Sequence, residues 1–238
     1  MEESTRDEIE RWWRDVFDLD RELWSSVTVS HPHASLGDYE GWFVAWRDGG
    51  VHVSAPSSAE AHEVASLANE AAIALRDAAF WQAFAHQRGL EVIGPSTHFY
   101  LDADPGPAVD VVALRADELA RLRDQVLPHE WVEGGMAHEP PPAVAFGILV
   151  DGTPVAAASL DDWRDAPSDI GVVVATDHRG HGLAEVVGRH AASYAVRHSG
   201  IARWRAATTN IASARTAERL GFEPYATQLA VRRGWSPA

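Results

Sequence analysis

The sequence has no cysteine among its 238 residues, which excludes disulfides, thiolate nucleophiles and thiolate metal sites. It has no lysine either, so all 20 of its basic residues are arginine. No apolar run approaches the roughly 20 residues that a helix needs to cross a bilayer. The first residues are acidic and polar, unlike a signal peptide. These absences predict a cytoplasmic protein without a membrane partner.

Positive charge is scarce overall, yet it is concentrated in one segment. The formal net charge of −15 argues against generic binding to nucleic acid or to an anionic membrane. From His178 onward there are nine arginines and three acidic residues, whereas residues 1–177 hold eleven arginines and 32 acidic residues. This local excess would attract an anionic ligand to the C-terminal segment. The alternative is a merely arginine-rich surface.

Residues 172–184, which read VVVATDHRGHGLA, are the most informative stretch. A β-branched run passes through a glycine-containing loop into a segment of helical type. Such a junction leaves backbone N–H groups pointing outward at the positive end of a helix dipole, where a phosphate or pyrophosphate binds. Glycine at the loop keeps side chains from holding the anion away.

Two common phosphate loops do not fit this stretch. The loop of nucleotide hydrolases requires a lysine, which the chain lacks. The dinucleotide fingerprint requires three glycines in the spacing G-x-G-x-x-G, and only Gly180 and Gly182 are present here. The spacing that does fit is Arg/Gln-x-x-Gly-x-Gly/Ala, carried by Arg179, Gly182 and Ala184.

Upstream, the pattern predicts an N-terminal α/β domain over residues 1–103 with six of the ten tryptophans. A linker of Asp, Pro and Gly follows at 102–107. The predicted elements of the first domain are helices at 5–17 and 57–88, the latter with a possible break near Arg76, and strands at 26–30, 41–47, 51–55 and 91–101.

The second predicted domain covers residues 108–238. Its predicted strands are 109–114, 143–150, 154–160, 169–174, 201–209 and a final strand region after Gly221. Its predicted helices run over 116–126, from the glycine loop to 198, and over 211–220, with long loops at 127–142 and 161–168.

This element order and a second motif at 210–222, NIASARTAERLGF, together resemble the GNAT superfamily of acyl-CoA-dependent N-acyltransferases. The resemblance implies an α/β (α+β) fold with a mixed, mostly antiparallel sheet flanked by helices in the C-terminal half. The smaller N-terminal domain is similar to part of a second, degenerate GNAT-like fold. Acetyl-CoA is the implied acyl donor, and a primary amine that attacks it directly is the implied acceptor.

In this family two parallel strands, here 169–174 and 201–209, splay apart and hold the pantetheine arm. The implied coenzyme A contacts are backbone groups of the first strand, the pyrophosphate loop and the start of the last helix: Val172, Val173, Val174, Arg179, Gly180, His181, Gly182, Leu183, Ala184, Asn210 and Ser213. Asn210 is alternatively only a helix cap.

The resemblance leaves the catalytic groups less well defined. Many members place a tyrosine acid seven residues after the asparagine, where this chain has Ala217. Ser213 matches another branch and is the candidate for contacting the leaving sulfur, with Tyr225 a weaker one. Asp169 is the candidate base. The alternatives are a helix-surface serine and a solvated strand end.

The acceptor site is expected at His129, Glu130, Trp131 and Asp161, an acidic pocket with aromatic walls that suits a cationic amine. No metal is expected, since His31, His33 and Asp38 read as a solvated turn. A monomer or homodimer without nucleic acid is expected. Two alternatives remain: a non-catalytic acyl-CoA-binding or regulatory protein, and an N-terminal half that binds a partner or dimerises.

Overall fold

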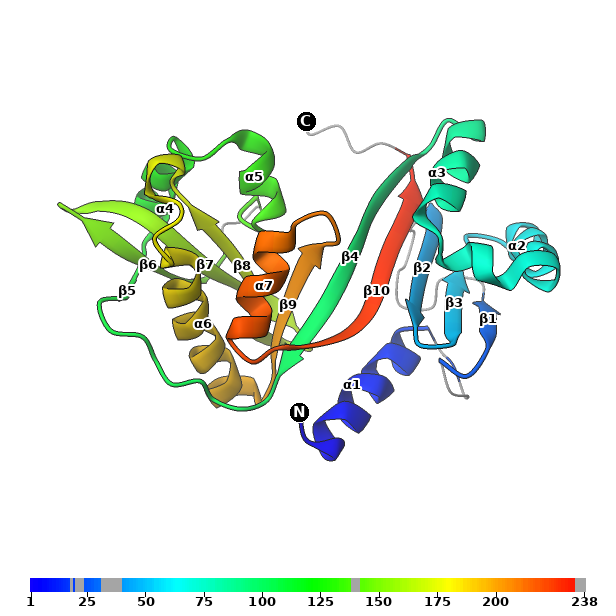
Figure 1. Cartoon of the computed structure of the whole chain (residues 1–238), viewed down its shortest axis with the longest axis horizontal. Coiled ribbons are helices and arrows are strands. Elements are labelled where there is room, and N and C mark those ends of the chain that lie inside the picture. The colour runs from blue at the N-terminus through cyan, green and yellow to red at the C-terminus, as the bar shows by residue number, and fades with distance from the viewer. Residues whose placement is uncertain (18, 20–23, 31–39, 138–141, 234–238) are drawn as a thin grey trace. The chain divides into compact units, whose positions relative to one another are not determined.

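The computed structural model describes residues 1–17, 19, 24–30, 40–137 and 142–233 (Figure 1). The chain forms two compact units. The N-terminal unit holds residues 2–98, 207–209 and 225–238, and the central unit holds Met1, 99–206 and 210–224. This division differs from the predicted domains of 1–103 and 108–238, because the segment from Tyr225 onward belongs with the N-terminal residues. In the described part of the chain no helix is both long and apolar enough to span a membrane.

The N-terminal unit is a sheet with helices packed against it. Its strand order is β1-β3-β2-β10-β4, in which β1 is parallel to β3, and β2 is antiparallel to both β3 and β10. Its elements are α1 (Glu3–Val16), β1 (Val27–Ser30), β2 (Gly41–Arg47), β3 (Gly50–Ser54), α2 (Ser58–Ala71), the 3-10 helix η1 (Ala72–Arg76), α3 (Ala78–Gln87), and most of β4 (Glu91–Leu101) and β10 (Glu223–Arg232). Residues 99–101 of β4 and 223–224 of β10 belong to the central unit.

The predicted break near Arg76 is confirmed. The 3-10 helix ends there, and Asp77 caps α3 by accepting a hydrogen bond from the Ala79 N–H at 2.8 Å. This cap satisfies an N–H that has no partner inside the helix.

The central unit contains a five-stranded arrangement in the order β9-β8-β7-β6-β5, antiparallel except for the parallel pair β8–β9. The mixed, mostly antiparallel sheet flanked by helices confirms the predicted fold class. The elements are β5 (Val112–Ala113), α4 (Ala116–Arg123), α5 (Pro128–Glu133), β6 (Val144–Val150), β7 (Thr153–Trp163), β8 (Ala166–Val174), the 3-10 helix η2 (Thr176–His178), α6 (Leu183–Ser199), β9 (Ala202–Ala207) and α7 (Ile211–Arg219).

Two predicted loops of the central unit are wrong. Residues 127–142 include the short helix α5. Residues 161–168 mostly belong to β7 and β8, which join through Arg164 and Asp165 at φ of 58° and 60°. Both central turn residues therefore have the left-handed conformation of a two-residue hairpin turn, which sequence normally signals with Asn-Gly or Asp-Gly. Neither residue here is glycine, so the turn gave no such signal.

The sheet of the central unit separates its helices into two layers because alternate strand residues face opposite sides. Ile170, Val172 and Val174 join the core cluster that contains residues of α6 and α7. Val173 joins the cluster with Leu119 and Leu122 of α4 and Trp131 of α5. β8 therefore lies between both layers.

A close backbone approach fixes α5 against β8. A Cβ built on Gly171 would lie 2.2 Å from the Gly134 carbonyl oxygen, and one on Gly134 would lie 2.3 Å from Val173 Cγ1. Side chains at these positions would force the two segments apart.

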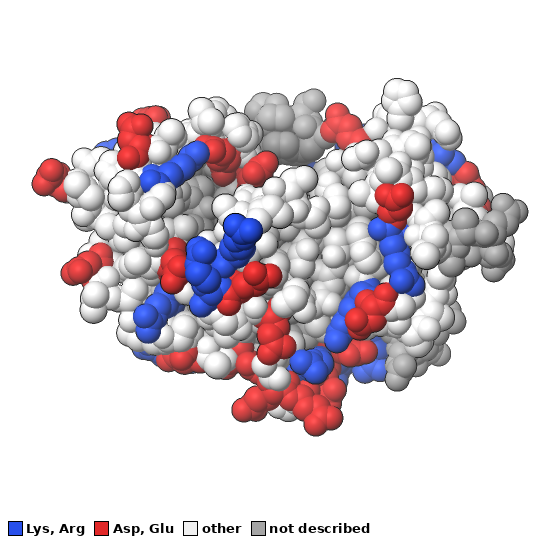
Figure 2. All heavy atoms as spheres, in the orientation of Figure 1, with Lys and Arg blue, Asp and Glu red and all other residues white. Residues whose placement is uncertain are grey.

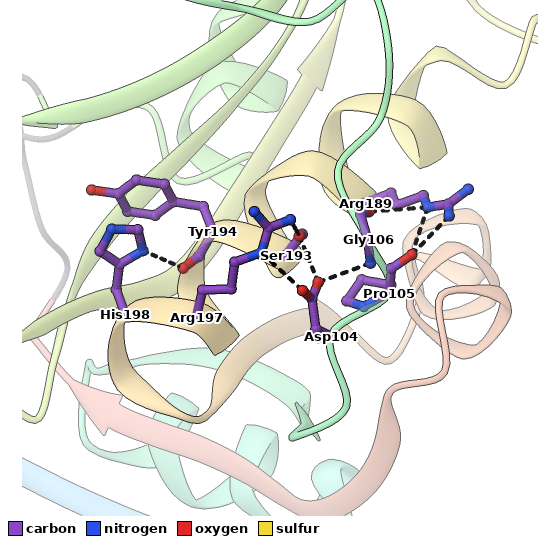
Figure 3. A network of polar contacts seen from close by, with 8 residues as sticks. All are labelled: Asp104, Pro105, Gly106, Arg189, Ser193, Tyr194, Arg197 and His198. Carbon is purple, nitrogen blue, oxygen red and sulfur yellow. Dashed lines mark hydrogen bonds and ion pairs between the residues drawn. The ribbon is translucent and has the colours of Figure 1, made fainter.

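The predicted linker is held along α6 (Figure 3). Asp104 accepts hydrogen bonds from Ser193 Oγ at 2.5 Å, the Gly106 N–H at 2.8 Å and Arg197 Nε at 2.8 Å. Arg189 also donates to the Pro105 carbonyl, at 2.7 Å from one guanidinium nitrogen. The segment after β4 is thus a strap tied to the helix.

Because of the hydrogen bonds that hold this strap, we expect the stability of the fold to fall at low pH. The hydrogen bonds from Ser193, Gly106 and Arg197 lower the pKa of Asp104 from 3.8 to about 2. A depressed folded pKa gives stability that is present above the unfolded value and is lost as pH falls through about 2. Chemical denaturation between pH 5 and 2 should show a smaller loss in Asp104→Asn than in wild type. Equal pH profiles would contradict the assignment.

Gly171→Ala should destabilise the protein, because its methyl group meets the Gly134 carbonyl. Overpacking of this kind costs about 1–3 kcal/mol, measurable as a lower midpoint in urea. Gly49→Ala is the matched control, since a Cβ there meets nothing within 4 Å. A Gly171→Ala variant as stable as the control would show that α5 can move away from β8 freely.

Candidate functional site

The parallel strands β8 and β9 separate after two residue pairs. Their register contains only Asp169 with Arg203 and Ile170 with Trp204, although β8 continues to Val174 and β9 to Ala207. The other edge of β8 pairs with β7 as far as Val174. The edge of β8 beyond Ile170 on the β9 side is therefore outside the ladder. The divergence implied by the family resemblance is present, and it leaves backbone groups able to pair with an added extended chain.

The glycine loop follows directly at the end of β8. Gly180 and Gly182 have φ of 79° and 76°, and Gly182 is the N-cap of the 17-residue helix α6. No side chain caps this helix, and a Cβ at either glycine would meet nothing within 4 Å. Open space thus lies beside the uncapped N–H groups at the positive end of the helix dipole. An anion such as a pyrophosphate fits this arrangement.

Arg179, the first residue of the loop motif, is held by Glu130 of α5. Its two terminal nitrogens donate to the two carboxylate oxygens of Glu130 at 2.7 and 2.6 Å, and its Nε donates to the Val174 carbonyl at 3.3 Å. These hydrogen bonds lower the pKa of Glu130 and raise that of Arg179. A predicted cofactor residue and a predicted acceptor residue are therefore partners of each other.

Several arginines of the C-terminal segment are paired with carboxylates. Figure 2 shows acidic side chains beside the basic ones on the face in view. The ion pairs of these arginines are Arg179–Glu130, Arg197–Asp104, Arg203–Asp169, Arg205–Asp169 and Arg219–Glu185. Much of the charge expected to attract an anion is balanced by carboxylates, mainly from earlier in the chain.

Asp169 sits where the two strands part, and it is buried. Its Oδ2 lies 2.8 Å from Arg205 and 3.7 Å from Arg203, and its side chain is 8% exposed. Its Oδ1 is buried without a hydrogen-bond partner in the described part of the chain. Asp169 is thus a paired, buried carboxylate, so the alternative of a solvated strand end is wrong.

Asn210 and Ser213 lie together at the start of α7. Asn210 Oδ1 accepts a hydrogen bond from the Ser213 N–H at 3.0 Å, so Asn210 does cap its helix. Its side-chain nitrogen donates to no residue in the described part of the chain, so the cap leaves its donors for a ligand. Ser213 Oγ accepts a hydrogen bond from Trp204 Nε1 at 3.0 Å.

The two positions considered for a tyrosine acid, Ala217 and Tyr225, are both buried. Ala217 is fully buried in the core cluster beneath α6 and α7. Tyr225 belongs to the N-terminal unit, is 3% exposed, and its hydroxyl accepts a hydrogen bond from Trp24 Nε1 at 3.2 Å. It is part of that unit's aromatic core.

The predicted acceptor residues only partly come together. His129 is exposed on α5, whereas Trp131 is 7% exposed in the core and leaves little surface for a pocket wall. Asp161 is a strand residue opposite Asp169, not a loop residue. Of the two predicted acidic groups of the pocket, Glu130 is paired with Arg179.

No cluster of metal-binding side chains occurs among the described residues, and His31, His33 and Asp38 lie outside them. His181 of the glycine loop is exposed, and its Nδ1 lies 3.3 Å from the His178 carbonyl oxygen. Sequence reasoning missed Trp204. The only signal for it was a tryptophan at an inward position of a strand beside the second motif.

A sequence model of the acetyltransferase (GNAT) family matches residues 111–222. Among solved structures, a GNAT-family protein from Novosphingobium aromaticivorans is 20% identical, with a TM-score of 0.47 over 62% of this chain and 69% of its own. A GNAT-family acetyltransferase from Colwellia psychrerythraea is 17% identical, with a TM-score of 0.45 over 60% and 57%. A GCN5-related N-acetyltransferase from Kribbella flavida is 21% identical, with a TM-score of 0.43 over 63% and 62%.

The chain thus spans less than two thirds of the Colwellia and Kribbella proteins. No protein of curated function matches it. Apart from residues 207–209, the family match lies within the central unit, and it includes the loop motif and the α7 motif. Residues 111–222 therefore form a domain that matches the GNAT acetyltransferase family.

Proposed function

We propose that the protein is an N-acetyltransferase that transfers an acetyl group from acetyl-CoA to a primary amine by direct attack. The match of residues 111–222 to the GNAT acetyltransferase family supports acyl transfer from an acyl-CoA donor in general. The observation that carries the proposal is the parting of β8 from β9 immediately before an uncapped helix N-terminus. An extended arm with two amides and a terminal pyrophosphate matches an open strand edge followed by an anion site.

The donor would be held mainly by backbone groups. The β8 backbone at Val172 and Val174 would pair with the pantetheine amides, and the N–H groups of residues 179–184 would hold the pyrophosphate. The Val173 backbone, also expected to contact coenzyme A, pairs with Ala157 of β7. The Asn210 side-chain amide would donate to the arm beside α7. All three lie in the central unit.

The reaction needs a neutral amine, a polarised thioester carbonyl and stabilisation of the leaving thiolate. Attack of the nitrogen forms a C–N bond and a tetrahedral intermediate, and its collapse breaks the C–S bond. An N–H of β8 near Val174 would donate to the oxyanion. Ser213 is our candidate for donating to the sulfur.

The amine must lose a proton, and Asp169 is the candidate to receive it. Only its Oδ1 is without a hydrogen bond in the described residues, since Oδ2 is held by arginine. The acceptor would be shaped by the α5 side of the sheet, where His129 and Glu130 lie.

A second candidate function is binding of acyl-CoA without catalysis. Ala217, fully buried where many members have a tyrosine, favours it. The two functions differ in turnover, so we would measure release of free coenzyme A with a panel of amines, peptides and aminoglycosides. Acetyl-CoA binding with no turnover on any amine would favour the second function, and absence of binding would refute both.

Gly182→Val should abolish coenzyme A binding in calorimetry, because its side chain would fill the open space beside the loop. The substitution also strains a left-handed backbone. Gly152→Val is the matched control for strain, since Gly152 has the same φ of 76° and also meets nothing within 4 Å. Unchanged affinity in Gly182→Val would refute the placement of the pyrophosphate.

Glu130→Gln should tighten coenzyme A binding by about two- to fivefold, the range expected for release of an exposed ion pair. The amide holds Arg179 less strongly, which leaves the guanidinium for the pyrophosphate. Glu133→Gln is the control, because it makes the same charge change at an exposed site of α5. The gain should vanish in an Arg179→Ala background. Weaker binding in Glu130→Gln would mean that Glu130 positions Arg179 and does not compete for it.

A further inference from the structure

The buried indole of Trp204 is part of the candidate site, although no motif assigned it. Trp204 is 3% exposed, and it lies opposite Ile170 in the last residue pair before the strands separate. Its Nε1 donates to Ser213 Oγ at 3.0 Å. The side chain thus reaches from the point of divergence to the start of α7.

A glycine on α6 makes room for this indole. A Cβ on Gly188 would lie 3.0 Å from Cζ3 and 3.2 Å from Cη2 of Trp204. Phe222 packs edge-on against the ring, with centroids 5.7 Å apart at 64°. Glycine inside a helix costs about 1 kcal/mol relative to alanine, so its presence in the middle of α6 needs a packing reason. The indole supplies one, and the packing fixes the direction of its N–H.

The hydrogen bond determines what the Ser213 hydroxyl can do. An indole N–H is only a donor, so Ser213 Oγ must accept, and the hydroxyl hydrogen stays available for another acceptor. Thr216, one turn later, donates its hydroxyl hydrogen to the Ala212 carbonyl at 2.9 Å. Ser213 makes no such donation to any described residue. A hydroxyl that accepts a hydrogen bond also becomes a stronger donor.

We infer that Trp204 is a positioning residue that directs the Ser213 hydroxyl toward the sulfur of bound coenzyme A. This inference rests on the proposed function. Trp204 itself does not touch the reacting atoms. It occupies one lone pair of Ser213 Oγ, so that the O–H points into the gap between β8 and β9 and donates to the leaving thiolate as the C–S bond breaks.

Trp204→Phe keeps an aromatic ring but removes the N–H donor and part of the indole's volume, and the control variant makes the same truncation. It should lower kcat by about two- to tenfold, the effect of one neutral hydrogen bond, with KM for acetyl-CoA unchanged. Trp81→Phe is the control, because Trp81 is also fully buried and its Nε1 donates to the Leu75 carbonyl at 2.9 Å, in the N-terminal unit. In a Ser213→Ala background, Trp204→Phe should have no further effect on kcat.

Gly188→Ala offers a test that leaves Trp204 in place. The added methyl group displaces the indole and should reproduce the kcat loss of Trp204→Phe. An effect of Trp204→Phe on KM alone, or the same kcat loss with and without Ser213, would overturn the inference.

A binding measurement decides the matter without turnover. The Trp204 indole N–H signal in a ¹H–¹⁵N spectrum, identified by its loss in Trp204→Phe, should shift on adding coenzyme A. It should not shift with desulfo-coenzyme A, which lacks the sulfur. Coenzyme A binding with equal responses to both ligands, or with none, would overturn the role of Trp204 alone. No binding of coenzyme A to wild type would overturn the proposed function as well.

Discussion

The early end of the β8–β9 ladder is the constraint on which the rest of the central unit depends. Two residue pairs hold these strands together, and beyond Ile170 and Trp204 each continues without the other. A continuous ladder would satisfy those backbone groups internally and leave no edge for an extended ligand. Because β8 stays paired to β7 throughout, it remains in the sheet after its pairing with β9 ends. The divergence ends at the glycine loop, so one structural feature leads to both parts of the candidate donor site.

Around this divergence the packing depends on where side chains are missing. Gly171 and Gly134 let the backbone after α5 contact β8, and Gly188 lets the Trp204 indole contact α6. In each case the backbone or ring of another segment occupies the space that a side chain on the glycine would fill. Close-packed interiors leave little freedom to shift by the width of a methyl group. These glycines therefore determine the position of α5 and Ser213 as strictly as any polar contact.

Electrostatics in the central unit is mostly internal. Glu130 and Asp169, chosen as acidic groups for an amine, each hold arginine from the C-terminal segment. Part of the excess positive charge after His178 is therefore paired with part of the excess negative charge before it. Arg179 is of functional interest because it lies in the glycine loop, where its partly exposed ion pair with Glu130 can be exchanged for a pair with another anion.

The sequence by itself determined the local elements and the loop, because apolar periodicity, glycine spacing and helix starts depend on neighbouring residues. It therefore predicted the strand, loop and helix around Gly182 and most of the element order. It missed the turn at Arg164 and Asp165, because these residue types do not indicate a positive φ. It also missed the helix at Pro128–Glu133. Tertiary structure alone decided that Tyr225 joins the N-terminal unit, that Glu130 pairs with Arg179 and that Trp204 contacts Ser213. These are contacts between residues far apart in the chain or on different elements, and they depend on shape and charge complementarity that no local pattern contains.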